Sequence, residues 1–355
     1  MSNLSKIINA LPENADGILI TNSKNQYYAT NFQFEDGYVF ITRERSYLIT
    51  DFRYVEAARA TANKEYEIIS MSRNRADVFK TICRDNKLST VLFEDSTLTV
   101  EDYETFKNIF NEIGVRLEGA KRLIEKLREF KEEYEIENII KAQRIAEQAF
   151  EHILGFINYD RTEAEVALEL EFKMRSLGAS NVSFQTIAVS GDASALPHGV
   201  GRNVKLRKGF FTMDFGAIYN GYCSDMTRTV VIGKADNEIK RIYNTVLAAQ
   251  TEAINAAKEG ITGAELDGVA RTIINNAGFE GCFGHGLGHG VGLDIHEAPS
   301  VSVAGKIELT KGHVVTVEPG IYLEGKYGVR IEDMLVFTEN GPINITKAPK
   351  NLIEI

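Results

Sequence analysis

The sequence predicts an α/β domain at the N-terminus, followed by an α+β domain that contains an internal repeat. Its 355 residues suffice for two domains of about 150 residues each. Short apolar runs alternate with helical patterns over the first third of the chain. The remainder shows the same order of helix, strand and turn signals twice. Together these observations favour two domains, the second of which is built from two related halves.

The first domain is predicted from strand and helix patterns between residues 16 and 120. Short apolar or alternating runs predict five strands, at residues 17–20, 38–41, 47–49, 68–69 and 90–93. Helical patterns lie between the later strands, near residues 53–62, 76–86 and 101–113. Such alternation is typical of an α/β layer with a partly parallel sheet.

The domain boundary is placed where the composition changes. Residues 121–134 form a highly charged segment with a helical pattern. We therefore expect one domain over residues 1–124 and a second over residues 125–355. His152, in the helix that follows, is interpreted as structural because it lies beside an apolar stripe. The stripe consists of Ile139, Ala142, Ala146, Ala149, Ile153 and Ile157.

The second domain contains an internal repeat with matched landmarks. Capping-box patterns begin one helix at Thr162 and another at Thr262, each with a glutamate three residues later. Each half continues with an apolar strand that ends in a carboxylate, followed by glycine and Ile-Tyr. A turn and a returning strand with a second acidic residue complete each half. We expect the two halves to face each other and to bring two pairs of carboxylates together.

Composition argues against several classes of protein. Hydrophobic residues make up 44% of the chain and charged residues 25%, which is ordinary for a soluble globular protein. The formal net charge of −10 disfavours a nucleic-acid partner and an anionic membrane surface. Cys83, Cys223 and Cys282 are widely spaced, and the first residues lack the pattern of a signal peptide. We therefore expect reduced thiols, a cytoplasmic location and no membrane-spanning segment.

Two pairs of acidic residues are predicted to meet across hairpins. Asp214 and Asp225 flank an Asn-Gly pair, a strong tight-turn signal, so they should lie opposite or diagonal to each other. Glu318 and Glu332 are symmetric about a glycine and should face each other similarly. Directly opposed Cβ atoms lie about 5 Å apart, and like charges that close are costly inside apolar strands unless they share a proton or a metal. Four such carboxylates at one seam favour more than one cation.

A glycine-rich segment supplies candidate imidazole ligands. His285, His289 and His296 are interleaved with five glycines, although the whole chain has only six histidines. The glycine spacing does not match a phosphate-binding loop. His198 follows a proline just before the first acidic strand and is a fourth candidate, whereas His313 begins an apolar strand and is interpreted as structural. Carboxylates combined with imidazole suit Mn²⁺, Co²⁺, Fe²⁺ or Zn²⁺.

These motifs resemble the creatinase, aminopeptidase P and prolidase branch of peptidase family M24, whose catalytic domain has the fold known as pita-bread. The resemblance extends from about residue 130 to the end of the chain, and residues 28–32 and 50–54 also resemble the creatinase-like N-terminal α/β domain of that branch. The stretches that carry it are Pro197-His198, residues 214–217, residues 221–229, residues 285–290, residues 317–320 and residues 329–333. The fold expected from it is a creatinase-like domain followed by a pita-bread domain with a pseudo-two-fold repeat.

By position, the resemblance implies five metal ligands: Asp214, Asp225, His289, Glu318 and Glu332. Two divalent ions would share Asp225 and Glu332. Asp214 would complete one site, and His289 together with Glu318 would complete the other. Manganese is the first choice of metal, with cobalt, zinc and iron as alternatives.

The resemblance also implies roles in hydrolysis of the peptide bond before proline. Glu318 would accept the proton of the attacking water and deliver it to the leaving nitrogen. His198, His285 and His296 would orient the substrate and stabilise the oxyanion. Arg330 lies two residues before a ligand and would orient a ligand carboxylate.

The sequence after the glycine-rich segment bears on substrate length. Many prolidases of this kind resemble His-Glu-x-Pro-Arg there, and the arginine holds the free carboxylate of a dipeptide. This chain has serine, Ser300, in place of the arginine, which favours an Xaa-Pro aminopeptidase over a prolidase. The prolidase, a non-catalytic creatinase-like binding protein and a metal-independent amidinohydrolase are the alternatives, and the complete ligand set disfavours the last two. The resemblance implies proline-containing peptides as substrates and a homodimer.

Overall fold

The computed structural model describes residues 2–71 and 74–355. Contacts divide the chain between Arg128 and Glu129 into two compact units, whereas the sequence analysis placed the boundary between residues 124 and 125. In the described part of the chain, no helix combines the length and apolar character needed to cross a membrane.

The first unit is built on a six-stranded mixed sheet in the order β4-β3-β2-β1-β5-β6. Its strands are β1 (Gly17–Ile20), β2 (Gly37–Thr42), β3 (Ser46–Thr50), β4 (Tyr66–Ser70), β5 (Thr90–Phe93) and β6 (Arg116–Gly119). Its helices are α1 (Asn3–Ala10), α2 (Ser23–Thr30), α3 (Phe52–Thr61), α4 (Arg75–Asp85), α5 (Val100–Asn111) and α6 (Leu123–Arg128). The pairs β1–β5, β3–β4 and β5–β6 are parallel, which confirms the predicted partly parallel sheet.

The five predicted strands of this unit are present, and one strand was missed. The missed strand, β6, pairs with β5 at the edge of the sheet, and its side chains are exposed or half-buried. An edge strand of this kind has no continuous apolar run, so the sequence gives little signal for it. Against the sheet, Phe79 of α4 and Phe106 of α5 pack edge to face with ring centroids 5.7 Å apart and form part of the core.

The sequence pattern suggested a helix over residues 121–134, but the structure divides this charged segment between two helices. Helix α6 ends at Arg128, and α7 (Glu133–Phe156) begins after a break. Glu132 ends the break as the first member of a capping box, because its backbone N–H donates to the Glu135 carboxylate at 2.9 Å. The backbone N–H of Lys131 donates to the carbonyl of Gly312 at 2.8 Å, so a long-range contact fixes the break.

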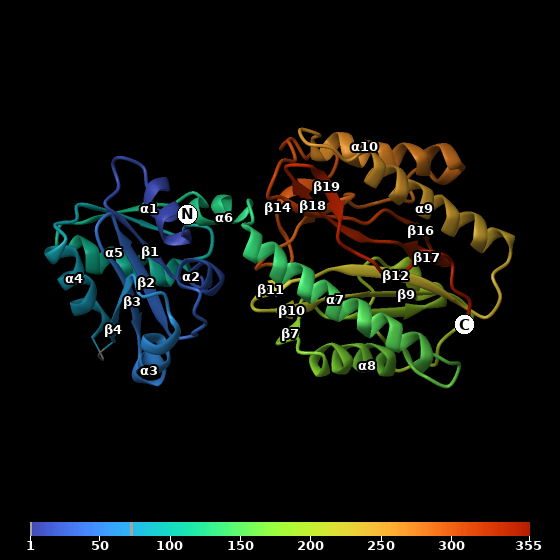
Figure 1. Ribbon diagram of the computed structural model, residues 1–355, viewed down its shortest axis with the longest axis horizontal. Helices are drawn as coiled ribbons and strands as arrows, with labels where there is room; N and C mark the ends of the chain where they lie inside the picture. Colours follow the sequence, from blue (N-terminus) through green and yellow to red (C-terminus); the bar gives the residue numbers. More distant parts are fainter. Residues whose placement is uncertain (1, 72–73) are drawn as a thin grey trace. The chain divides into compact units, whose positions relative to one another are not determined.

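The second unit consists of two halves, each with two helices and two antiparallel sheets (Figure 1). The first half contains α7, α8 (Glu163–Ser176), β7 (Asn181–Val182), β8 (Ile187–Ser190), β9 (Gly209–Phe215), β10 (Ala217–Tyr219), β11 (Tyr222–Cys223) and β12 (Met226–Ile232). The second half begins with α9 (Asn237–Ala256), α10 (Gly263–Ile274), β13 (Gly288–Gly290) and β14 (Glu297–Val301). It ends with β15 (Val314–Val317), β16 (Gly320–Leu323), β17 (Tyr327–Arg330), β18 (Asp333–Thr338) and β19 (Gly341–Asn344).

The strands of this unit lie between two pairs of helices. In Figure 1, α7 and α8 lie on one side of β9 and β12, and α9 and α10 lie on the other side of β16 and β17. Two apolar cores result: one packs α7 and α8 against β9 and β12, and the other packs α9 and α10 against β15 to β18. The helices cover the outer faces of the sheets. The side of the strands that faces the other half is therefore left uncovered, and a site can form there between the two halves.

The predicted internal repeat is confirmed at its capping boxes. The Glu165 N–H donates to Thr162 Oγ1 at 3.1 Å, and the Glu265 N–H donates to Thr262 Oγ1 at 3.2 Å. Both threonines also form an isolated antiparallel bridge, Thr162 with Lys205 and Thr262 with Glu308. The corresponding helices of the two halves therefore begin with the same capping box. In each half, the capping threonine also pairs with the segment that precedes the main hairpin.

His313, which the sequence analysis interpreted as structural, is buried just before β15. Its ring stacks on Phe130 with centroids 4.7 Å apart, and its Nδ1 accepts a hydrogen bond from the Thr310 N–H at 3.0 Å. Burial, with Lys131 nearby, lowers the pKa of His313 to about 4. The folded protein therefore holds the neutral imidazole, whereas the unfolded chain binds a proton at the ordinary histidine pKa.

We predict that acid weakens the fold through His313. Its contribution is complete above the unfolded pKa, near 6.5, and is lost as the pH falls toward the folded value of about 4. At pH 5 the loss should be about 2 kcal/mol relative to pH 8. His313→Asn keeps an acceptor for the Thr310 N–H and should flatten this part of the urea-unfolding profile between pH 8 and 5. An unchanged pH slope in the variant would contradict the assignment.

Candidate metal centre

The first acidic pair is positioned by the hairpin of the first half. The turn has positive φ at Asn220 (47°) and Gly221 (81°), as a tight two-residue turn requires. Asp214 lies in β9 opposite Thr227 of β12, and Asp225 lies two residues before Thr227. The two aspartates are therefore diagonal neighbours, which confirms one of the two predicted arrangements.

The second acidic pair lies where two antiparallel ladders meet. Val317 of β15 pairs with Asp333 of β18, and Gly320 of β16 pairs with Arg330 of β17. Glu318 and Glu332 occupy the positions between these pairs, on opposite strands. The prediction that they face each other across the hairpin is therefore confirmed by the register on both sides.

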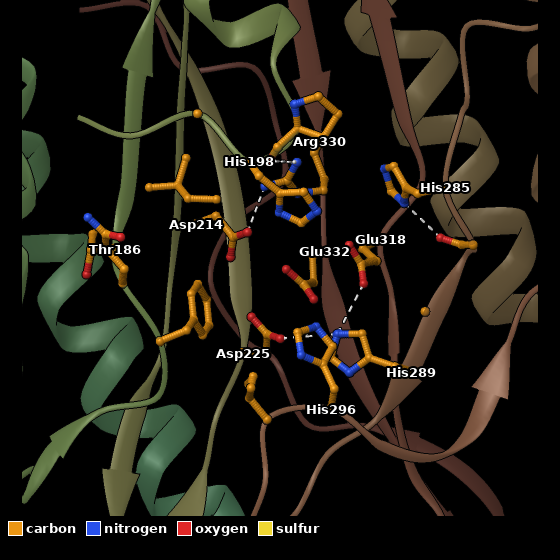
Figure 2. Close-up of a pocket in the computed structure, with 18 of the residues that line it drawn as sticks. Thr186, His198, Asp214, Asp225, His285, His289, His296, Glu318, Arg330 and Glu332 are labelled. Atoms are coloured by element: carbon orange, nitrogen blue, oxygen red, sulfur yellow. Dashed lines mark hydrogen bonds and ion pairs between the residues drawn. The ribbon is translucent and has the colours of Figure 1, made fainter. Parts of the chain in front are cut away.

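The two pairs and His289 converge on one point. Ligand atoms of Asp225, His289 and Glu332 all lie within 4.8 Å of one another. His289 Nε2 is 3.5 Å from Asp225 Oδ2 and 3.3 Å from Glu318 Oε1. Figure 2 shows the four carboxylates gathered at the centre of the cavity, with His289 beside Asp225 and Glu318. His289 Nδ1 donates to the Gly290 carbonyl at 3.1 Å, which leaves Nε2 free to act as a ligand.

The carboxylates are under electrostatic strain. Burial, and then the neighbouring acidic groups, raise the pKa of Asp225 and of Glu332 well above the ordinary range. Burial also raises the pKa of Asp214, although Arg330 opposes this. Burial acts in the same direction on Glu318, but the contact with His289 and the nearby His285 and Arg330 together outweigh burial and lower the pKa of Glu318. In the metal-free protein, a negative charge is therefore most costly at Asp225 and Glu332.

The site fits divalent cations. Among the residues that the structure describes, Asp214 Oδ1 and Glu332 Oε1 are buried oxygens without a hydrogen-bond partner. A buried carboxylate oxygen that no donor satisfies is expensive unless it binds a cation. Carboxylates that share space with one imidazole offer the hard and borderline donors typical of Mn²⁺, Co²⁺, Fe²⁺ and Zn²⁺.

Neighbouring side chains orient these carboxylates. Arg330 Nη2 donates to Asp214 Oδ2 at 2.6 Å, which is the kind of contact expected for Arg330 from the sequence. Thr227 Oγ1 donates to Glu332 Oε2 at 2.7 Å. These donors fix one oxygen of each carboxylate and leave the other facing the centre.

Two residues of the site were missed by sequence reasoning. Thr316 Oγ1 donates to Glu318 Oε1 at 3.1 Å and accepts from the His289 N–H at 3.0 Å. It lies two residues before Glu318 on one strand, so the two-residue period of strands was an available signal. Tyr322 belongs to the repeated Ile-Tyr pattern, which was noted only as a landmark of the repeat.

The ring of His285 is held at both nitrogens. Nδ1 donates to the Gly286 carbonyl at 2.8 Å, so Nε2 is the acceptor. Tyr322 Oη accepts from Arg330 Nη1 and donates to His285 Nε2, both at 2.8 Å. Burial lowers the pKa of His285, in agreement with a neutral ring.

The backbone around His285 is held by a buried ion pair on α10. Asp267, which is fully buried, pairs with Arg271 at 2.7 Å and accepts from the Leu287 N–H at 3.0 Å. Arg271 donates to the carbonyls of Phe283 and His285 at 2.7 and 2.8 Å. One helix therefore fixes the backbone of every second residue from Phe283 to Leu287 in the glycine-rich segment.

His198 and His296 have rings that are less constrained. Both line the cavity, and within the described chain neither ring makes a hydrogen bond. The segment that carries His198 is anchored at its two ends by Glu163, which accepts from the N–H groups of Ser190 (2.8 Å) and Arg202 (3.0 Å). The two rings are therefore available to donate to a bound ligand.

These groups line a cavity of about 500 Å³ that opens beside the carboxylates. Its walls include Phe184, Ile187, Pro197, Val200 and Ile295, which give it an apolar side, and Ser300 and Ser302. All nine predicted ligand, histidine and arginine positions lie along its wall. A cavity with a cluster of carboxylates on its floor, an apolar side and several imidazoles suits metal-assisted hydrolysis of a small, partly apolar substrate.

The comparison with known proteins identifies the family. The profile of metallopeptidase family M24 matches residues 137–339, and that of the creatinase/prolidase N-terminal domain matches residues 3–130. The chain belongs to metallopeptidase family M24. Its second unit is the pita-bread catalytic domain, and its first is the creatinase-type domain, as the sequence motifs predicted. Family membership makes it a peptidase that depends on divalent metal ions.

Relatives resemble the chain over nearly its whole length. An Xaa-Pro dipeptidase from Bacillus anthracis has a structure with a TM-score of 0.95, is 43% identical, and the match covers 99% of each chain. An X-Pro aminopeptidase from Thermotoga maritima has a TM-score of 0.91 and is 36% identical, with 96% of this chain and 98% of that chain covered. An Xaa-Pro dipeptidase from Pyrococcus furiosus is 36% identical in sequence, with 99% of each chain covered.

We predict opposite effects of Glu332→Gln on metal binding and on the metal-free fold. The variant should hold less Mn²⁺ per chain than the wild type, measured by inductively coupled plasma mass spectrometry. Because the folded pKa of Glu332 is raised, its charge costs stability as the pH rises above the ordinary carboxylate range. In EDTA at pH 8 the variant should therefore unfold at a higher temperature than the wild type.

The exposed Glu308→Gln is the matched control and should change neither quantity. Wild-type metal content in Glu332→Gln, together with an unchanged melting temperature in EDTA, would show that Glu332 is no ligand.

Proposed function

We propose that this chain hydrolyses the peptide bond before proline and releases the N-terminal residue, as an Xaa-Pro aminopeptidase. The observation that carries the proposal is the complete set of four carboxylates and one imidazole at the floor of a cavity lined by three further histidines. The family supports peptide hydrolysis, and the relatives named Xaa-Pro dipeptidase and X-Pro aminopeptidase support the preference for proline.

Asp214, Asp225, His289, Glu318 and Glu332 are proposed to hold two divalent ions, with Asp225 and Glu332 shared between them. Manganese is the first choice, and cobalt, zinc and iron fit the same donors. When bound, such ions act as Lewis acids, which lower the pKa of water and polarise a peptide carbonyl.

Glu318 is proposed as the proton carrier. Its contact with His289 lowers its pKa, so the carboxylate is ionised at neutral pH and can accept a proton from the attacking water. The same carboxyl group then returns the proton to the proline nitrogen as the peptide bond breaks. Thr316 holds Glu318 Oε1, which limits the motion of the carboxylate between the two transfers.

The three histidines divide into two roles. His198 and His296 have free ring nitrogens and are proposed to bind the substrate and to stabilise the oxyanion. Burial lowers the pKa of His296, which keeps that ring neutral at neutral pH. His285 also faces the cavity, but both its nitrogens are engaged, so its proposed part is to fix Tyr322 and, through it, Arg330.

The charge of the cavity wall favours substrates longer than a dipeptide. Among the described residues that line it, Arg330 is the one arginine or lysine. Its guanidinium already donates to Asp214, Thr227, Tyr322 and the Pro197 carbonyl. No fixed cation of the described wall is left for the carboxylate of an Xaa-Pro dipeptide, whereas a longer peptide does not need one there.

A second candidate is an Xaa-Pro dipeptidase. Several relatives that match almost the full chain are named so, at 36% and 43% identity. For both candidates we also propose a cytoplasmic homodimer. Within the described chain no disulfide joins the three cysteines, which supports a reducing compartment, and the dimer rests on the family resemblance.

A three-peptide panel with Mn²⁺ tests the proposed function. Ala-Pro-Ala should be cleaved to Ala and Pro-Ala, Ala-Ala-Ala should stay intact, and EDTA should abolish the reaction. Cleavage of Ala-Pro alone would replace the aminopeptidase with the dipeptidase. If none of the three peptides were cleaved with or without metal, a non-catalytic binding protein would be the better account.

Replacing Ser300 should shift the preferred substrate length. Ser300→Arg places a cation at an exposed position of the cavity wall and should raise kcat/KM for Ala-Pro relative to Ala-Pro-Ala up to about fivefold, the value of roughly one exposed ion pair. Ser300→Gln adds similar bulk without charge and should leave the ratio near that of the wild type. An equal shift in both variants would mean that size, not charge, sets the length preference.

A further inference from the structure

His296 lies in an irregular turn between β13 and β14. Its ring centroid is 4.2 Å from that of His289, and the ring faces the cavity (Figure 2). No regular ladder holds residues 292–296, and the ring makes no hydrogen bond within the described chain. The position of this imidazole therefore depends on how the turn itself is fixed.

The carboxylate of Glu297 fixes that turn from inside. Glu297 Oε1 accepts from the Asp294 N–H at 2.9 Å, so one side chain closes the turn around His296. A Cβ atom at Gly292 would lie only 2.6 Å from Glu297 Oε2, which shows how closely the carboxylate packs against the start of the turn. Any movement of the Glu297 carboxylate would be passed to the residues on both sides of His296.

Lys131 neutralises this carboxylate. Lys131 Nζ lies 3.2 Å from Glu297 Oε2, and the two side chains are only 1% and 8% exposed. Lys131 comes from the break between α6 and α7, more than 160 residues earlier in the chain, where its N–H is held by the Gly312 carbonyl. A buried ion pair loses much of its Coulomb energy to desolvation, but loss of one partner leaves the other charge uncompensated.

We propose that Lys131 is a positioning residue for His296, acting through Glu297. This inference rests on the proposed function, in which His296 binds the substrate. Lys131 touches neither the substrate nor the carboxylates of the metal centre. Its contribution is to hold the Glu297 carboxylate where it closes the turn, so that the His296 ring points into the cavity.

The geometry gives a direct way to separate this role from general stability. Lys131→Met removes the cation that pairs with the buried Glu297 carboxylate. The carboxylate should then shift toward water or bind a proton, and the turn that it closes should move. In Lys131→Met/Glu297→Gln both charges are absent, and the amide oxygen of the new glutamine side chain can still accept from the Asp294 N–H. The double variant should therefore fold and restore the turn, because a neutral pair replaces a broken ion pair.

The control is a second ion pair, remote from the cavity. Arg144 pairs with Glu147 on α7, and the Glu147 carboxylate also accepts a backbone N–H, that of Lys347. Arg144→Met thus removes the cation from a carboxylate that likewise accepts a backbone N–H. The variant measures the effect of breaking an ion pair on kcat where no cavity histidine is involved.

The experiment measures kcat and KM for Ala-Pro-Ala and the metal content of each Mn²⁺-loaded variant. The ¹⁵N-histidine imidazole spectrum is recorded on each Zn²⁺-loaded variant, because Zn²⁺ is diamagnetic and Mn²⁺ would broaden nearby signals. The His296 signal is assigned from its loss in His296→Gln. Lys131→Met should lower kcat about 10- to 100-fold with metal content unchanged, the range found for residues behind a metal site. It should move the His296 signal, and the double variant should return both to near the wild-type values.

A cycle with His296→Gln completes the test. If Lys131 acts through His296, Lys131→Met should add little further loss in the His296→Gln background. Independent, additive losses, an unmoved His296 signal, or an equal loss of kcat in Arg144→Met would overturn the proposal. If the wild type cleaved no Xaa-Pro peptide, the proposed function would fail, and the imidazole spectra alone would decide whether Lys131 positions His296.

Discussion

The catalytic unit is organised around the mutual repulsion of four carboxylates that the fold forces together, two of them buried (Asp225 and Glu332) and two half-buried (Asp214 and Glu318). Strand register places Asp214 and Asp225 as diagonal neighbours and Glu318 opposite Glu332. Apolar packing of helices against both outer faces holds this register, so the acidic side chains cannot separate without disrupting two cores. Repulsion of this kind raises carboxylate pKa values in the metal-free protein and is relieved by divalent cations. The fold thus favours metal binding, because bound cations relieve a repulsion that the strand register imposes.

Around this centre, each positive charge is engaged with a neighbouring group. Arg330 lines the cavity but holds the Asp214 carboxylate, Arg271 holds the backbone of the glycine-rich segment, and Lys131 holds the turn of His296. Buried ion pairs contribute little net stability, but their geometry is narrow. Arg271 and Lys131 each fix a segment that lacks regular structure, and Arg330 fixes a carboxylate on strand β9. The cavity wall also carries imidazoles and serines, and no unengaged lysine or arginine among its described residues, which suits a peptide whose chain continues past proline.

Much of the fold and the centre could be read from the sequence because the signals were local or repeated. The Asn-Gly turn and the symmetric spacing of the glutamates determine the register, so the carboxylate pairs followed from spacing alone. The ligand set itself came from the family resemblance. What could not be read depends on contacts between distant segments. Strand β6 is an exposed edge without an apolar run, the break before α7 is fixed by Gly312, and Lys131 reaches Glu297 across half the chain. Tyr322 was visible as a repeated pattern, but its hydrogen bonds to His285 and Arg330 depend on the packing of β16 on β17.

The central claim is that the five side chains Asp214, Asp225, His289, Glu318 and Glu332 form one two-metal centre. The most direct measurement is anomalous diffraction from crystals grown with Mn²⁺, collected on both sides of the manganese absorption edge. The account predicts two strong anomalous peaks between these side chains, with Asp225 and Glu332 in contact with both. A single peak that omits Asp214, or peaks elsewhere with none at this seam, would contradict it.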